Sequence, residues 1–147
     1  MIFDNKEFHI YMAEDDLDDQ DIFYDAIANI DENIKIKMFT DGILLLEALS
    51  KNKDAPHVIF LDLHMPKMDG EETLKEIRKQ SALNNIPVVI FSNEYNIDRI
   101  ANLFEMGANR YLHKPESFKT LVSALDRTIC SIKSNDLGGT AIINYKE

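Results

Sequence analysis

The sequence predicts an α/β fold in which helices cover both faces of a parallel sheet. Apolar runs of four or five residues alternate along the chain with stretches of helical periodicity, which is typical of βαβ units. The chain has 147 residues, about the size of one domain, and 45% of them are hydrophobic. Because this is enough apolar material to cover both sides of a sheet, we expect a doubly wound fold with five strands and five helices.

The first half of the chain contains three of the predicted strands. A strand over 8–13 is followed by a helix whose apolar residues recur at helical spacing. Residues 34–39 alternate apolar residues with lysine, which indicates an edge strand with one exposed face. A second helix is expected from about 42 to 52, and residues 57–61, with the apolar run 58–61, then form the central strand.

The second half continues the alternation with three helices and two strands. The helix after Gly70 places its apolar residues inward and its charges outward, and a strand over 86–91 follows. A helix over 98–106 is closed by a glycine C-cap before a short strand over 110–112. The last helix covers 117–132.

We expect one domain over residues 1–133 and a C-terminal tail over 134–147. The tail contains Gly138-Gly139, which is typical of a flexible joint. Residues 140–145 could add a strand to the sheet, dock on the domain or form a partly ordered terminus.

Composition excludes several classes of function. The formal net charge is −10 and no cluster of lysine or arginine offsets it, so we expect no direct contact with nucleic acid. No apolar run approaches the roughly 18 residues of a membrane span, and the N-terminus lacks the apolar core of a signal peptide. The single cysteine, Cys130, allows no internal disulfide and is expected to pack in the core. These features predict a cytoplasmic protein with no membrane contact.

Polar side chains follow four of the five predicted strands. Glu14 and Asp15 follow the first strand, Asp62 the third, Ser92 the fourth and Lys114 the fifth. In an open parallel sheet, ligands bind outside the carboxyl ends of the strands, where the strand order reverses. In the flavodoxin-like order 2-1-3-4-5 the first and third strands are neighbours, and the three carboxylates then converge.

Three converging carboxylates repel one another unless a cation or a lysine compensates their charge. Mg²⁺ takes oxygen ligands and keeps several waters, which makes it the expected metal. His64 lies two residues after Asp62, and because imidazole is a common ligand of transition metals, such a metal is an alternative. Asp62 is also a candidate nucleophile that forms an acyl phosphate, because Lys114, Ser92 and the cation could stabilise a transferring phosphoryl group.

Each of these residues also has a plainer interpretation. Asp62 alone fits a turn or cap aspartate, the serine fits a helix cap, and the lysine fits a solvated strand end. The acids after the first strand could simply favour the positive end of a helix dipole, which is our interpretation of Asp18 and Asp19. Their joint placement at four strand ends favours a site.

Residues 8–132 resemble the receiver domain of bacterial two-component response regulators. The motifs that carry the resemblance are Glu14-Asp15, Asp62-Leu63-His64-Met65-Pro66 with Asp69-Gly70, Ser92, and Lys114-Pro115. The resemblance implies that Asp62 accepts a phosphoryl group from a phosphohistidine on a histidine kinase or a histidine phosphotransfer protein. The acidic run after the first strand is also similar to that of stand-alone receivers, which carry no output domain.

The resemblance also implies roles for the surrounding groups. Asp15 and Asp62 would bind Mg²⁺ directly. Glu14 would bind it mostly through water, and His64 through its backbone carbonyl oxygen. Lys114 would act with Asp62 in phosphoryl transfer.

A switch is implied as well. In receivers a hydroxyl residue swings toward the phosphoryl oxygen and an aromatic residue on the last strand follows it inward; Ser92 and Tyr111 match these positions. Lys114-Pro115 would be a candidate cis peptide. Output would pass through protein contact or phosphoryl relay to a partner that the sequence does not identify. A phosphorylation-dependent homodimer stays open.

Departures from the family pattern leave alternatives. His64 and Glu94 would flank the path of the water that attacks the phosphoryl group, so the phosphoryl lifetime is open. An aspartyl-phosphate phosphohydrolase would need a second aspartate where His64 stands. A flavodoxin-type carrier is disfavoured because the acidic run 14–19 would repel the phosphate of FMN. A pseudo-receiver that only binds partners is the third alternative.

Overall fold

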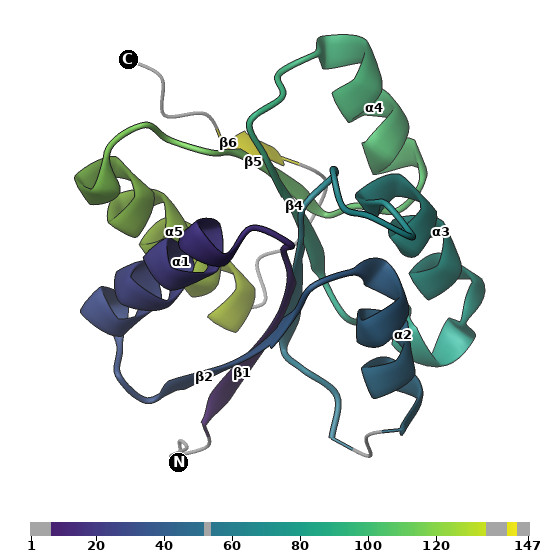
Figure 1. Cartoon of the computed structure of the whole chain (residues 1–147), viewed down its shortest axis with the longest axis horizontal. Helices are drawn as coiled ribbons and strands as arrows, with labels where there is room; N and C mark the ends of the chain where they lie inside the picture. The colour runs from purple at the N-terminus through teal and green to yellow at the C-terminus, as the bar shows by residue number, and fades with distance from the viewer. Residues whose placement is uncertain (1–6, 52–53, 135–140, 144–147) are drawn as a thin grey trace.

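The computed structural model describes residues 7–51, 54–134 and 141–143 and has the predicted alternation of strands and helices (Figure 1). The strands are β1 (Phe8–Ala13), β2 (Ile34–Phe39), β3 (Val58–Leu61), β4 (Val88–Ser92), β5 (Arg110–His113) and β6 (Ala141–Ile143). The α-helices are α1 (Leu17–Ile30), α2 (Gly42–Lys51), α3 (Gly70–Lys79), α4 (Ile97–Glu105) and α5 (Phe118–Lys133). A short 3₁₀ helix, η1 (Ser81–Leu83), follows α3 and was not predicted.

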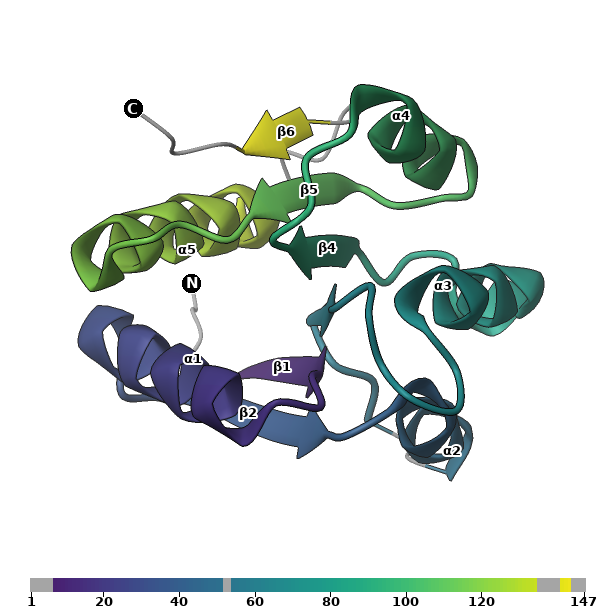
Figure 2. The same ribbon diagram turned by 45° about the horizontal axis from the view of Figure 1, so that its top comes forward.

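The sheet has the order β2-β1-β3-β4-β5-β6, and every neighbouring pair is parallel. The predicted order 2-1-3-4-5 is therefore confirmed, with one further strand beside β5. Helices α1 and α5 cover one face of the sheet, and α2, α3 and α4 cover the other (Figures 1 and 2). The order reverses between β1 and β3, which brings the ends of these two strands together.

Each face of the sheet carries its own hydrophobic core. Phe60 of β3 and Phe91 of β4 pack with Phe23 of α1 beneath α1 and α5. On the opposite face, Leu61 of β3 packs in a cluster with Leu74 of α3. Strand β3 is buried on both sides, whereas β2 exposes its two lysines as the alternating pattern predicted.

Residues 141–143 of the tail form strand β6. Arg110 of β5 pairs with Ala141, and Leu112 pairs with Ile143, in parallel register. Of the three alternatives for this segment, the added strand is the one the structure has. The Gly138-Gly139 joint lies outside the described residues.

Arg78 connects α3 to the end of α4 and to the segment before β5. Its guanidinium group donates to the carbonyl oxygens of Gly107 (3.0 Å), Leu83 (3.0 Å) and Ile86 (2.9 Å). It also donates to Asn109 Oδ1 at 3.1 Å, and that oxygen accepts the N–H of Val88 as well. Gly107 has a φ of 112°, a left-handed conformation that favours glycine, as expected for the residue after α4.

The prediction that Cys130 packs in the core was wrong. Its side chain is exposed on α5, with the thiol 3.7 Å from Asp126 Oδ1. The buried stripe of α5 is formed by other residues, Leu125, Ile129 and Ile132 among them, and residue 130 is rotated away from it. In the described part of the chain, no helix has the length and apolar character needed to cross a membrane.

Candidate functional site

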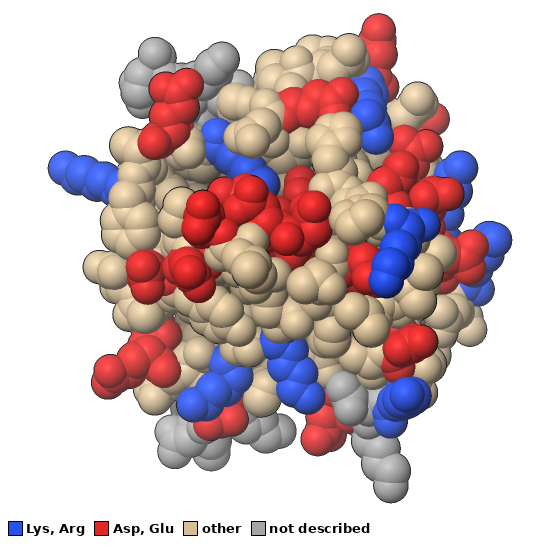
Figure 3. Space-filling view, in the orientation of Figure 1, with Lys and Arg blue, Asp and Glu red and all other residues tan. Residues whose placement is uncertain are grey.

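Three carboxylates meet at the carboxyl ends of β1 and β3, as the sequence predicted. Oxygen atoms of Glu14, Asp15 and Asp62 lie within 4.8 Å of one another. Ala13 of β1 pairs with Leu61 of β3. Glu14 and Asp15 directly follow Ala13, and Asp62 directly follows Leu61, so this pairing brings the three acids together. Glu14 is 1% exposed and Asp62 is 6% exposed, whereas Asp15 is exposed to solvent. In the space-filling view, acidic side chains gather near the start of α1 (Figure 3).

The start of α3 also packs closely against this site. Asp69 caps the helix and forms a capping box with Glu72. A Cβ at Gly70 would collide with the carbonyl oxygen of Asp62. The absence of a side chain at Gly70 therefore lets α3 begin directly against the end of β3.

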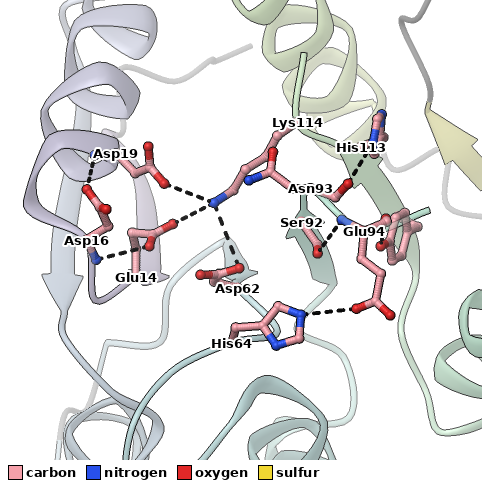
Figure 4. A network of polar contacts seen from close by, with 11 residues as sticks. Glu14, Asp16, Asp19, Asp62, His64, Ser92, Asn93, Glu94, His113 and Lys114 are labelled. Carbon is pink, nitrogen blue, oxygen red and sulfur yellow. Dashed lines mark hydrogen bonds and ion pairs between the residues drawn. The ribbon is translucent and has the colours of Figure 1, made fainter. Parts of the chain in front are cut away.

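Lys114 brings a positive charge to the carboxylates from the end of β5 (Figure 4). Its Nζ lies 3.0 Å from Glu14 Oε1, 3.3 Å from Asp19 Oδ2 and 3.8 Å from Asp62 Oδ1. The side chain is only 12% exposed, and its backbone N–H donates to the carbonyl oxygen of Ser92 at 2.8 Å. The predicted lysine is thus placed beside the predicted acids.

Burial and charge act in opposite directions on the acids and the lysine. Burial raises the pKa of Glu14 to about 7; Lys114 opposes that rise, and the charge of Asp62 adds to it. Burial also raises the pKa of Asp62 against the opposing charge of Lys114. For Lys114, burial lowers the pKa, but the carboxylates of Asp62 and Glu14 raise it by more. The single ammonium group therefore does not fully compensate the buried acids.

This donor set fits a hard divalent cation. The three clustered groups offer oxygen atoms only, and the buried acids carry more negative charge than Lys114 neutralises. The imidazole of His64 lies outside this group and pairs with Glu94, with Nε2 3.1 Å from Oε1. The acidic cluster therefore suits an oxygen-ligated divalent metal better than a site built on the His64 ring.

Ser92 and Tyr111 are linked through the backbone of one residue, Glu94. The Ser92 Oγ accepts the N–H of Glu94 at 3.0 Å, and the Tyr111 hydroxyl donates to the carbonyl oxygen of Glu94. Ser92 is fully buried and Tyr111 is 1% exposed. A movement of Ser92 would therefore change the contacts at the start of the β4–α4 loop, to which Tyr111 is also bound.

An ion-pair chain leads from the site to α4 and α3. His64 contacts Glu94, and Arg99 of α4 lies 3.3 Å from Glu94 Oε1. The second guanidinium nitrogen of Arg99 lies 3.5 Å from Glu71 Oε1 on α3. The sequence placed His64 and Glu94 beside the phosphoryl position but did not predict this contact between them.

One expectation about the site is wrong, and a second is incomplete. The bond between Lys114 and Pro115 is not cis, since no cis peptide bond occurs among the described residues. The trans form is the intrinsic preference of a bond before proline, by about 0.5–1 kcal/mol. Asp19, interpreted only as a helix-dipole residue, contacts Lys114. Its placement in the first turn of α1, four residues after Asp15, was the available signal.

A cavity of about 290 Å³ adjoins Lys114 on the side of α1. Phe23, Phe91, Asp19 and Lys114 contribute to its lining, and Lys114 also contacts the acidic cluster. Ile22 and Phe118, which also line it, are each 45% exposed. The site is therefore bordered by exposed apolar surface on this side.

Comparisons with known proteins agree with this fold and site. The family model described as the response regulator receiver domain matches residues 10–126. Response regulator Rcp1 of Synechocystis sp. is 30% identical over 117 residues, which is 76% of this chain and 80% of Rcp1. Two-component response regulator ORR3 of Oryza sativa is 32% identical over 109 residues, 74% of this chain and 81% of ORR3.

Solved structures give the same result. The phosphorylated cyanobacterial phytochrome response regulator RcpA superposes with a TM-score of 0.81 at 28% identity, covering 88% of this chain and 96% of RcpA. The Mn²⁺-bound form of Rcp1 superposes with a TM-score of 0.72 at 28% identity, covering 89% of this chain and 95% of Rcp1.

The fold and its acidic pocket define the class: a signalling phosphoacceptor domain with a doubly wound parallel sheet. The chain belongs to the response regulator receiver domain family of two-component signalling. Its pocket of Glu14, Asp15 and Asp62 is compatible with binding of a divalent metal and with phosphorylation.

Proposed function

We propose that Asp62 accepts a phosphoryl group from the phosphohistidine of a histidine kinase or a histidine phosphotransfer protein. The observation that carries this proposal is the buried Asp62 carboxylate, which lies 3.8 Å from the Lys114 ammonium in a cluster with two further acids. The proposal includes a cytoplasmic location, which a chain with a single exposed cysteine favours.

Mg²⁺ is the proposed cofactor. Asp15 and Asp62 would hold it directly. Glu14 would act mostly through water, and the carbonyl oxygen of His64 would complete the protein ligands. When bound, the ion would offset the charge of the acids and of the transferring phosphoryl oxygens. The all-oxygen donor set of the cluster supports this choice.

The transfer itself requires little covalent chemistry from the protein. An Asp62 oxygen forms the new O–P bond as the P–N bond to the donor imidazole breaks, and the electron pair of that bond stays on the imidazole. The Lys114 ammonium pairs with the phosphoryl oxygens, and the Ser92 hydroxyl donates to one of them. Lys114 is within reach of this position, because its nitrogen already borders Asp62.

The proposed switch begins at Ser92. When its Oγ turns to a phosphoryl oxygen, it gives up the N–H of Glu94, and the start of the β4–α4 loop is released. Tyr111, whose hydroxyl is bound to the Glu94 carbonyl, then takes a new position. This local change would alter the surface around the exposed residues Tyr95 and Ile97. That surface is the proposed contact for a downstream protein or for a second copy of the chain.

The phosphodonor is proposed to dock over the start of α1 and the start of α5. Ile22 and Phe118 expose apolar surface at this place, beside the cavity that Lys114 lines. A protein bound there would bring its phosphohistidine next to Lys114, whose ammonium lies 3.8 Å from Asp62 Oδ1. Residues 1–133 form the proposed receiver unit and 134–147 its tail.

A labelling experiment tests the proposal and separates it from the alternatives. Wild type and Asp62→Asn are incubated with Mg²⁺ and a small phosphodonor, with Asp18→Asn as a control for loss of one exposed acid. We expect one base-labile phosphoryl group on wild type and on Asp18→Asn and none on Asp62→Asn. Absence of label on wild type would favour the pseudo-receiver. Many turnovers on unrelated phosphate monoesters would instead indicate a phosphohydrolase.

A further inference from the structure

Lys114 contacts one acid that is not part of the metal-binding group. Glu14 and Asp62 belong to the cluster of three carboxylates, whereas Asp19, 3.3 Å from Lys114 Nζ, does not. Figure 4 shows the ammonium group between Asp19 and Glu14 on one side and Asp62 on the other. The nitrogen is closer to Asp19 than to Asp62, at 3.3 Å against 3.8 Å.

Asp19 is held in place by the helix that carries it. It lies in the first turn of α1, and its N–H donates to Oδ1 of the N-cap residue Asp16 at 3.0 Å. Its side chain is 39% exposed, so its contact with Lys114 is partly screened by solvent. A short side chain on a capped helix has little freedom, and it therefore offers Lys114 a fixed partner.

We propose that Asp19 is a positioning residue that draws Lys114 toward α1 in the unphosphorylated protein and thereby weakens the phosphorylated state. The proposal rests on the function proposed above. A phosphoryl group on Asp62 needs the ammonium, and each carboxylate near it competes for the same charge. Because Glu14 would share its charge with a bound cation, Asp19 is the competitor that persists when the metal is present.

Lys114 would keep a defined position without Asp19. Its ammonium still lies 3.0 Å from Glu14 and 5.2 Å from the centre of the Phe91 ring. The lysine would therefore not be released to solvent by Asp19→Asn. It would lose one of the two partners, Asp19 and Glu14, that hold it on the side away from Asp62.

The test measures the equilibrium affinity of the metal-loaded protein for beryllofluoride, which binds an aspartate carboxylate as a noncovalent stand-in for a phosphoryl group. At saturating Mg²⁺, we expect Asp19→Asn to bind it about two- to fivefold more tightly than wild type, the range typical of a partly exposed ion pair. Asp18→Asn removes the same charge from the same turn and should change the affinity less. Asp19→Glu should restore the wild-type value.

A second readout does not depend on metal or phosphoryl binding. In the metal-free protein, the Lys114 Nζ resonance should shift in Asp19→Asn and stay in place in Asp18→Asn. Unchanged or weaker beryllofluoride binding in Asp19→Asn, or equal effects of the two variants, would overturn the proposal. Failure of wild type itself to bind beryllofluoride would instead count against Asp62 as the phosphoacceptor, and the resonance would still report on the Asp19 contact.

Discussion

Glu14 is the residue in which the electrostatic conflict of the site is most pronounced. It is 1% exposed, its Oε1 contacts the ammonium of Lys114 at 3.0 Å, and its pKa is raised to about 7 by burial. At neutral pH a proton, the lysine and a cation therefore compete for one carboxylate. Loading of the site with metal should depend on pH in the range in which Glu14 titrates.

This competition predicts how stability depends on pH. Between the ordinary glutamate pKa of 4.5 and about 7, the folded protein binds more protons at Glu14 than the unfolded chain does. The contribution of Glu14 to the free energy of unfolding is therefore fully present below the lower value and is lost as pH rises through about 7. Thermal unfolding of the metal-free protein should show this fall, and Glu14→Gln should show less of it.

Added Mg²⁺ is the control for this prediction. Because the metal binds the deprotonated carboxylates, it should raise the unfolding midpoint above about pH 7 more than at about pH 5. An unfolding midpoint with the same pH dependence in wild type and Glu14→Gln would contradict the assigned role of Glu14.

The strand-end residues of the site could be predicted because the topology alone brings them together. Glu14, Asp62 and Lys114 each follow a parallel strand, and the carboxyl ends of parallel strands share one edge of the sheet. The Asp19–Lys114 and His64–Glu94 contacts depend instead on side-chain direction across loops. Sequence spacing does not determine that direction.

Arg78 shows how a single side chain sets the relation between several elements. From the end of α3 it binds carbonyl oxygens at the end of η1, just after η1 and after α4, and the side chain of Asn109 before β5. Leu83 O and Asn109 Oδ1 also accept the N–H groups of Ile86 and Val88, so Arg78 matters most to the carbonyl oxygens of Gly107 and Ile86. Arg78 therefore holds η1 and the end of α4 near the amino ends of the strands, at the end of the sheet opposite the acidic site.

Truncation of this side chain should be costly. We expect Arg78→Ala to lower the free energy of unfolding by about 2–3 kcal/mol, because the carbonyl oxygens of Gly107 and Ile86 lose the Arg78 donor in a partly buried junction. The matched control is Lys79→Ala, whose exposed pair with Glu76 should contribute less than about 1 kcal/mol. Chemical denaturation of both variants measures the difference. Equal losses would show that the four Arg78 contacts contribute no more than a surface pair.

The elements that the sequence predicted well are those with strong hydrophobic periodicity. The boundaries of β1 and β2 agree with the structure, and the predicted bounds of α2, α4 and α5 differ from it by at most one residue, because helix ends depend on local hydrogen bonds. The turn η1 has too few residues to show a period. Strand β6 has three residues, and only its pairing with β5 distinguishes it from a partly ordered terminus.

In the whole molecule, strand β6 (residues 141–143) pairs with β5 and so extends the sheet that carries the site. Ile142 pairs with Tyr111, the proposed switch residue, whereas the residues of the acidic pocket lie in the segments that follow β1 and β3. None of the three acids that form this pocket lies on β6. Residues 141–143 are therefore better placed to modify the surface around Tyr95 and Ile97 than to take part in phosphoryl transfer.

A truncated chain tests this division. We expect a chain that ends after Ser134 to fold and to accept a phosphoryl group at the wild-type level, with a modest loss of stability from the exposed edge of β5. Thermal unfolding and labelling with a small phosphodonor measure the two properties separately. A truncated protein that folds but takes no label would show that the tail belongs to the site.

Localisation of the phosphoryl group decides whether this molecule works as proposed. The protein is phosphorylated in Mg²⁺, the acyl phosphate is trapped by borohydride reduction, and the modified residue is identified by peptide sequencing in a mass spectrometer. We predict modification at Asp62 alone, dependent on Mg²⁺ and retained in Asp18→Asn. Modification at another carboxylate, or persistence of the label in Asp62→Asn, would contradict the proposed role of Asp62.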